Sequence, residues 1–140
     1  MLKLPASDSS LLVRTDFTDD ESWERASYEA SVENEDGFRA YIHPVNDPAL
    51  DGAAWQIVRT AALATNHGAA VLFIADHETL MSPDHPILVV DLVADRGAPL
   101  FRCIPSELWS VDNNLNIANM DWEEFASAAG ADGVFRGFAT

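Results

Sequence analysis

Two short segments that are apolar almost throughout constrain the fold of this chain more than any other feature. Residues 69–75 read AAVLFIA, and residues 87–93 read ILVVDLV. A strand with one buried face alternates apolar and polar residues, whereas a strand covered on both faces is apolar along its length. The two segments therefore predict central strands of a sheet that carries other layers of structure on both sides.

The segments that precede residue 69 predict alternating strands and helices. Residues 11–17 (LLVRTDF) are rich in β-favouring residues, and residues 38–43 alternate apolar and polar positions, so both are predicted strands. Because each connection between the first three strands holds a helical pattern, these strands should run parallel. The first helix is predicted from a capping box (Thr18, Glu21) and an inward stripe (Trp23, Ala26, Ala30), and the second from Asp51, Trp55, Val58 and Ala62, closed by Asn66 and Gly68.

The C-terminal half predicts a hairpin followed by helices. Asp95, Arg96 and Gly97 form a turn signal between residues 87–93 and a further predicted strand at residues 100–104. Pro105 suits the first turn of a helix, and Asp121 with Glu124 repeats the capping-box pattern. We therefore predict an α/β fold: a tail at residues 1–10, then a single layered domain at residues 11–140. Its sheet is mixed and five-stranded, the first three strands parallel and followed by the hairpin, with about four helices.

The charge balance excludes some classes of partner. The 140 residues include 23 acidic and 8 basic side chains, a formal net charge of −15. Such a surface repels nucleic acids and anionic lipids, so neither is a predicted partner. No apolar run reaches the roughly 18 residues of a membrane span, and the N-terminus does not have the pattern of a signal peptide. We expect a soluble cytoplasmic protein whose acidity serves solubility or meets a basic protein partner.

Several pieces of the sequence together resemble a known family. They read VRTDF, GFRAYI, ILVVDL, PSELWSVDNNLNIANMDWEEFA and GVFRGF, and the stretch at residues 106–125 is the most specific. The resemblance is to small uncharacterised actinobacterial proteins and covers most of the chain. It implies a free-standing single domain of unknown function, and it transfers no catalytic residues.

Candidate catalytic and metal-binding residues follow the predicted strands. If the first three strands are parallel, Asp16, His43 and Asp76 meet at one edge of the sheet, where open α/β folds bind ligands. A carboxylate beside a histidine can orient the imidazole for proton transfer. The alternative is that these aspartates only cap loops and helices. His77 and His85, in the segment DHETLMSPDH, are candidate metal ligands, but the segment lacks the one-turn spacing of a motif such as H-E-x-x-H, which favours a solvated loop over a metal site.

Candidate binding residues lie in the last third of the chain. Amides can line a ligand cleft or simply interrupt a helix, and an exposed tryptophan can anchor a protein interface. The chain shows no Gly-rich phosphate loop, dinucleotide fingerprint or nucleophile elbow, so it predicts no cofactor, and Lys3 is its only lysine. The candidate binding residues are Trp109, Asn113, Asn114, Asn116, Trp122, Glu123 and Glu124.

These observations favour a non-catalytic binding module, immunity-like or inhibitor-like, that recognises a basic protein. Two alternatives stay open. One is a metal-dependent or His/Asp hydrolase at the carboxyl ends of the strands. The other is a small-molecule binder that uses the asparagine-rich helix.

Overall fold

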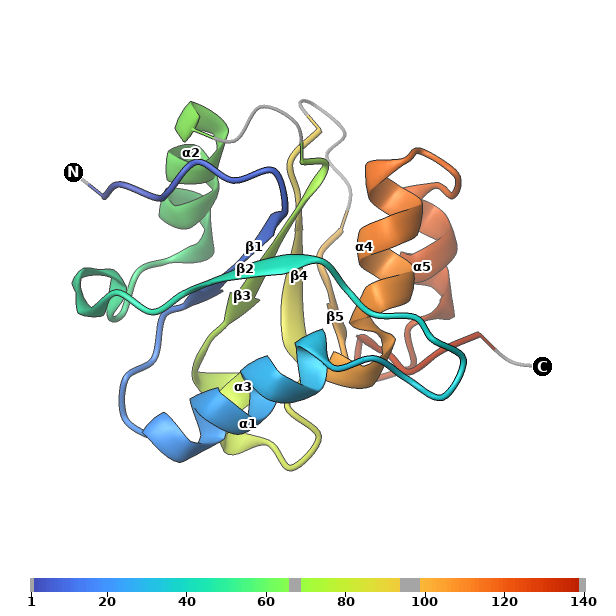
Figure 1. Ribbon diagram of the computed structural model, residues 1–140, viewed down its shortest axis with the longest axis horizontal. Coiled ribbons are helices and arrows are strands. Elements are labelled where there is room, and N and C mark those ends of the chain that lie inside the picture. Colours follow the sequence, from blue (N-terminus) through green and yellow to red (C-terminus); the bar gives the residue numbers. More distant parts are fainter. Residues whose placement is uncertain (1, 66–68, 94–98, 139–140) are drawn as a thin grey trace.

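A single six-stranded sheet organises the chain. The computed structural model describes residues 2–65, 69–93 and 99–138. The strands lie in the order β2-β1-β3-β4-β5-β6 (Figure 1). Their bounds are β1 Ser10–Arg14, β2 Ile42–Val45, β3 Val71–Ala75, β4 Ile87–Asp91, β5 Phe101–Cys103 and β6 Val134–Phe135.

The pairing confirms the predicted strand directions. β1 pairs in parallel with both β2 and β3, and β4 is antiparallel to both β3 and β5. β6 pairs in parallel with β5, so every strand except β4 ends at the same edge of the sheet. We call this edge the carboxyl edge. The turn signal at residues 95–97 and the predicted helix end at Asn66 and Gly68 lie outside the described residues.

The sheet has six strands rather than the five predicted from sequence. The additional strand comes from the apolar C-terminal segment, where Val134 and Phe135 pair with Arg102 and Cys103. Two residues are too few to show an alternating pattern, so only their pairing with β5 identifies them as a strand.

Helices cover both faces of the sheet. On one face, α1 (Asp20–Ser31), α4 (Leu108–Asn116) and α5 (Trp122–Ala128) bury their apolar sides against Leu12, Phe73 and Phe101. On the other face, α2 (Trp55–Thr65) and Leu4 pack on alternate residues of β1, β3 and β4. Figure 1 shows α2 on the left of the sheet and α4 with α5 on the right. Because β3 and β4 are buried at every position, the prediction from their apolar sequences is confirmed.

The helix boundaries differ from the predictions at several caps. Asp19, not Thr18, caps α1 by accepting from the Ser22 amide, and the Thr18 hydroxyl instead donates to Asp16. Asp121 precedes α5 without a side-chain cap bond, and Asp51 ends the 3-10 turn η1 (Pro48–Leu50) rather than starting α2. A fifth helix, α3 (His77–Met81), replaces part of a predicted loop, and η2 (Pro105–Glu107) leads into α4.

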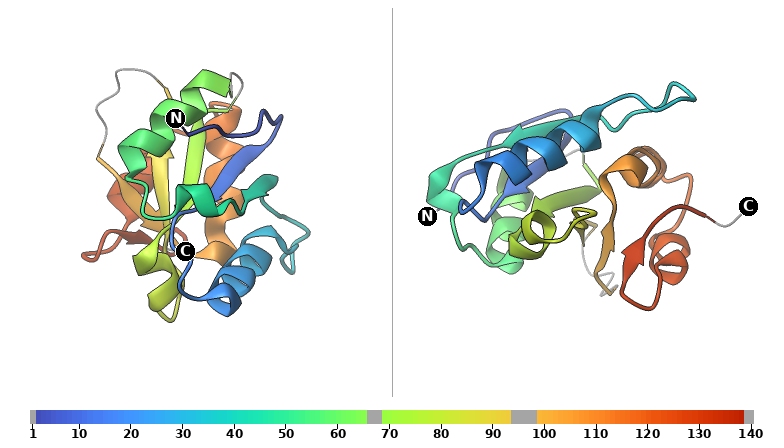
Figure 2. Two further views of the ribbon diagram at one scale, coloured as in Figure 1. Left: turned by 90° about the vertical axis from the view of Figure 1, so that its left-hand side faces the viewer. Right: turned by 90° about the horizontal axis from the view of Figure 1, so that it is seen from below.

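The second strand begins four residues later than predicted. The observed strand, Ile42–Val45, pairs with Ser10–Val13 of β1. Pro44 is tolerated in it because β2 is an edge strand, where a residue without an amide proton breaks no ladder on its free side. The predicted strand positions 38–41 instead form a connection beside α4. Figure 2 shows the turn that precedes them projecting beyond α1. Among the described residues, no helix has the length and apolarity needed to cross a membrane.

Candidate functional site

The carboxyl edge between β1 and β3 is the point where the chain changes direction across the sheet. From β1 the chain moves to β2 on one side and then returns to β3 on the other. Ligands of open α/β sheets bind in the crevice at such a switch point. Asp16 follows β1 here, and Asp76 and His77 follow β3, so the structure brings these three predicted residues to one edge.

Asp16 and His77 form a direct pair. His77 Nδ1 lies 2.6 Å from Asp16 Oδ2, and the Thr18 hydroxyl and amide donate to Asp16 Oδ1. Burial raises the pKa of Asp16, but the hydrogen bonds from Thr18 and His77 outweigh it, so the pKa lies below its usual value. An ionised carboxylate only accepts, so Nδ1 donates and the ring is held in one orientation. The pair can therefore act in proton transfer.

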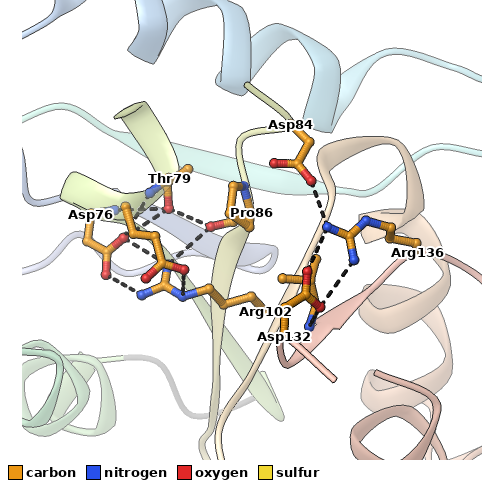
Figure 3. Close-up of polar contacts among 9 residues, drawn as sticks. Asp76, Thr79, Asp84, Pro86, Arg102, Asp132 and Arg136 are labelled. Atoms are coloured by element: carbon orange, nitrogen blue, oxygen red, sulfur yellow. Dashed lines mark hydrogen bonds and ion pairs between the residues drawn. The ribbon is translucent and has the colours of Figure 1, made fainter. Parts of the chain in front are cut away.

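Asp76 is not part of the Asp16–His77 pair and instead makes contacts that stabilise the fold. Its carboxylate caps α3 through Thr79 and accepts a two-pronged contact from Arg102, at 2.9 Å from Nη1 and 2.8 Å from Nη2 (Figure 3). Arg102 Nε also lies 3.0 Å from Glu78 Oε2. Burial raises the pKa of Asp76, but the bonds and charge of Arg102 outweigh it and hold the pKa below its usual value.

Replacing Arg102 with methionine should lower the free energy of unfolding by about 2 kcal/mol at pH 7. Breaking a fully buried pair costs roughly 3–5 kcal/mol, and partial exposure of Asp76 and Glu78 reduces this. Because the folded-state pKa of Asp76 is depressed, the stabilisation is present above the ordinary aspartate pKa of 3.8 and is lost as pH falls through the lower folded-state pKa. Urea unfolding of both proteins from pH 7 to pH 3 should show the difference shrinking below about pH 4.

Arg136 provides the matched control for this measurement. It pairs with Asp84 and Asp132, but its side chain is 47% exposed, against 17% for Arg102 (Figure 3). Arg136→Met should therefore change stability much less than Arg102→Met, since exposed ion pairs are screened by solvent. Equal losses from the two variants, or a loss at Arg102 that does not depend on pH, would contradict this assignment.

Of the described histidines, His43 and His85 form no hydrogen bond or ion pair with Asp16 or His77. His43 is the second residue of β2 and pairs with Leu11, so the structure does not bring it to the carboxyl edge. The shift of β2 along the chain is the physical reason. His85 is buried, and its Nδ1 lies 3.0 Å from the Thr79 carbonyl oxygen. Within the described ranges, no group of three potential ligands is arranged to hold a metal ion.

The predicted binding residues separate into buried and accessible ones. Trp122 is fully buried, and its Nε1 donates to the Pro99 carbonyl. Trp109 is half-buried and stacks on Phe38, with ring centroids 4.7 Å apart. Asn114 donates to the Ser110 carbonyl, which is a local helix contact. Glu123 and Glu124 are exposed in the first turn of α5.

Asn116 and Asn113 line a cavity at the edge opposite the carboxyl edge. The cavity has a volume of about 190 Å³ and lies where α4 meets the start of β1. Sequence reasoning missed Asp112, whose spacing of four residues from Asn116 places both on one side of the helix. The lining residues are Asp8, Ser9, Ser10, Tyr41, Ala69, Asp112, Asn113, Asn116 and Ile117.

Exposed aromatic and acidic side chains gather beside this cavity. Phe38 is 47% exposed and Tyr41 57%, and Ile117 at the end of α4 is 71% exposed. The turn that carries Phe38 is closed by hydrogen bonds with Asn34, and it holds three exposed carboxylates. We call this the acidic aromatic surface; it consists of Glu33, Glu35, Asp36, Phe38, Tyr41, Trp109 and Ile117.

The fold and these features define an open α/β domain with a mixed sheet, a polar cavity at one edge and an Asp–His pair at the other. The chain belongs to the family described as a domain of unknown function, DUF6924, whose model matches residues 9–138. This match confirms the resemblance to an uncharacterised family and brings no activity with it. Its actinobacterial source stays a prediction. No curated protein matches the chain.

Proposed function

We propose that this protein is a non-catalytic binding module that recognises a basic protein through its acidic aromatic surface. The observation that carries the proposal is the gathering of exposed rings and carboxylates on one surface. Phe38 and Tyr41 each expose about half of their side chains beside the turn that holds Glu33, Glu35 and Asp36. Exposed aromatic groups of this kind anchor protein interfaces, and the carboxylates specify the charge of the partner.

Arginine and lysine are the side chains that fit such a surface. A guanidinium group is attracted to the face of an aromatic ring, and its alkyl stem covers apolar area. The chain already shows this contact, because the Arg39 guanidinium lies 5.0 Å from the centroid of the Tyr41 ring. The stack of Phe38 on Trp109 holds both rings in place before binding, which reduces the entropy lost on association.

The charge of the whole chain supports the same partner. A net charge of −15 attracts basic proteins over long distances and speeds their encounter. An immunity-like or inhibitor-like function in the cytoplasm fits this charge and size. The single cysteine, Cys103, fits a reducing compartment because it is a free and buried thiol whose pKa is raised well above its usual value by burial.

The Asp16–His77 pair supports a second candidate function, a hydrolase that uses His77 in proton transfer. Its 2.6 Å contact and its place at the switch point favour it. However, the His77 side chain is 74% exposed, and it lines neither the cavity beside Asp112 nor the one beside Arg14. A reacting group that water reaches freely gains little from its surroundings, so this function ranks second.

Backbone amide shifts during titration with a basic peptide test the proposal. The probe is a ten-residue peptide of arginine, lysine and serine, and its control replaces each basic residue with glutamate. We expect shifts at residues 33–41 and 108–117 with the basic peptide alone. Shifts confined to residues around Asp16 and His77 would favour the second candidate, and shifts confined to α5 would contradict the proposed surface.

A further inference from the structure

Asp112 carries a buried carboxylate that no cation of the described chain neutralises. Asp112 as a whole is only 3% exposed. Its oxygens accept from the Ser10 hydroxyl at 2.7 Å, the Tyr41 amide at 2.9 Å and Asn116 Nδ2 at 2.8 Å, all uncharged donors. None of the ion pairs within residues 2–65, 69–93 and 99–138 involves Asp112.

A buried charge of this kind is costly without an ionic partner. Desolvation disfavours the ionised form, and hydrogen bonds from neutral groups compensate it only in part. For Asp112, burial raises the pKa, and the opposing hydrogen bonds from Ser10, Tyr41 and Asn116 do not cancel the increase. A cation placed beside this carboxylate would remove the imbalance.

The cavity beside Asp112 has the size and walls that suit a small cation. Its volume of about 190 Å³ is below the roughly 300–1,000 Å³ of pockets for drug-sized ligands, so it suits one side-chain head group. Asp8 adds a second carboxylate, and no basic residue is among those that line the cavity. The Arg39 guanidinium already lies 5.0 Å from the centroid of the Tyr41 ring, so Tyr41 and Ile117 contribute apolar area for an alkyl stem.

We propose that this cavity binds a guanidinium or primary ammonium group on an alkyl stem. The cation would lie between Asp112 and Asp8, with its stem along Tyr41 and Ile117. Since Tyr41 and Ile117 also belong to the acidic aromatic surface, an arginine or lysine side chain of the basic partner can enter the cavity while the partner covers that surface. This part rests on the proposed function, whereas binding of a free alkyl cation does not.

Small molecules of similar shape but different charge show whether the cavity recognises a positive charge or only the shape of its ligand. The probes are butylguanidinium, butylammonium and butylurea, the last being a neutral molecule of nearly the same shape as the first. Side-chain amide resonances of Asn113 and Asn116 report binding. We expect both cations to shift these resonances with at least tenfold higher affinity than butylurea. Equal affinity for butylurea and butylguanidinium would overturn the proposal.

Two variants keep the test independent of folding defects. Asp112→Asn removes the charge, and Asn113→Leu narrows the cavity without changing the hydrogen bonds of Asp112. In each variant we expect at least a tenfold loss of affinity for butylguanidinium, with the folded state checked by circular dichroism. If Asp112→Asn fails to fold, Asn113→Leu decides. Unchanged affinity in a folded variant would overturn the proposal.

The basic peptide distinguishes this inference from the proposed function. If the peptide binds the acidic aromatic surface but butylguanidinium does not bind the cavity, the cavity proposal fails and the binding module stands. If butylguanidinium binds but the basic peptide does not, the cavity is a site for free alkyl cations and the proposed function fails.

Discussion

Replacing Trp122 with alanine is expected to lower the free energy of unfolding by about 3–5 kcal/mol. Its ring is fully buried between α5 and the sheet, where it packs edge-on against Phe101 with centroids 4.9 Å apart. The variant would leave a cavity and also remove the donor to the Pro99 carbonyl. Equilibrium unfolding in urea, followed by circular dichroism, measures the loss.

Trp109→Ala is the matched control, because the same side chain is removed from a half-buried site. Only part of its ring area is lost from the core, so the expected destabilisation is about 1 kcal/mol. For binding of the basic peptide we expect the reverse order, with Trp109→Ala weakening the affinity more than Trp122→Ala. Trp109→Ala removes a ring of the acidic aromatic surface, whereas Trp122 does not reach that surface. Equal destabilisation by the two variants would show that Trp109 belongs to the core as fully as Trp122.

The layered architecture could be predicted from sequence because it depends on average properties of long segments. The apolar runs at residues 69–75 and 87–93 identify the central strands, and the intervening helices fix the parallel direction of the first three. The exact bounds depend on pairing partners that lie far away in the chain. Thus the bounds of β2 are set by its pairing with β1 rather than by the alternation of apolar and polar residues in its own sequence. Likewise, β6 forms only because β5 is beside it.

The candidate sites were predictable only in part. The meeting of Asp16, Asp76 and His77 follows from parallel strands, but the choice of Arg102 as partner of Asp76 depends on β5, which is distant in sequence. The amide cluster in the sequence singled out Asn116, which lines the cavity beside Asp112. Asp112 could not, because its burial results from contacts with Ser10 and Tyr41, each more than 70 residues away along the chain.

Neutralising the three carboxylates of the acidic aromatic surface is expected to weaken binding of the basic peptide at least tenfold at low salt. The variant Glu33→Gln/Glu35→Gln/Asp36→Asn removes three negative charges from the turn that carries Phe38. Loss of nearby charge lowers the attraction for arginine and lysine directly, and the dependence of affinity on salt should become shallower.

A second triple variant gives a control of equal net charge. Asp121→Asn/Glu123→Gln/Glu124→Gln removes the same number of charges from the start of α5, which lies outside the acidic aromatic surface. If long-range charge alone attracted the peptide, both variants would weaken binding equally. If the surface is the binding site, the α5 variant should change affinity by less than about threefold at 100 mM salt and above, where distant charges are screened.

The affinity of the basic peptide for these two proteins, measured by fluorescence anisotropy from 20 to 300 mM salt, is the most direct test of the binding function. We predict a large loss for the variant at residues 33–36 and, at 100 mM salt and above, nearly the affinity of the unmodified protein for the α5 variant. Equal affinities for the two variants, or no binding of the peptide to the unmodified protein at 20 mM salt, would contradict it.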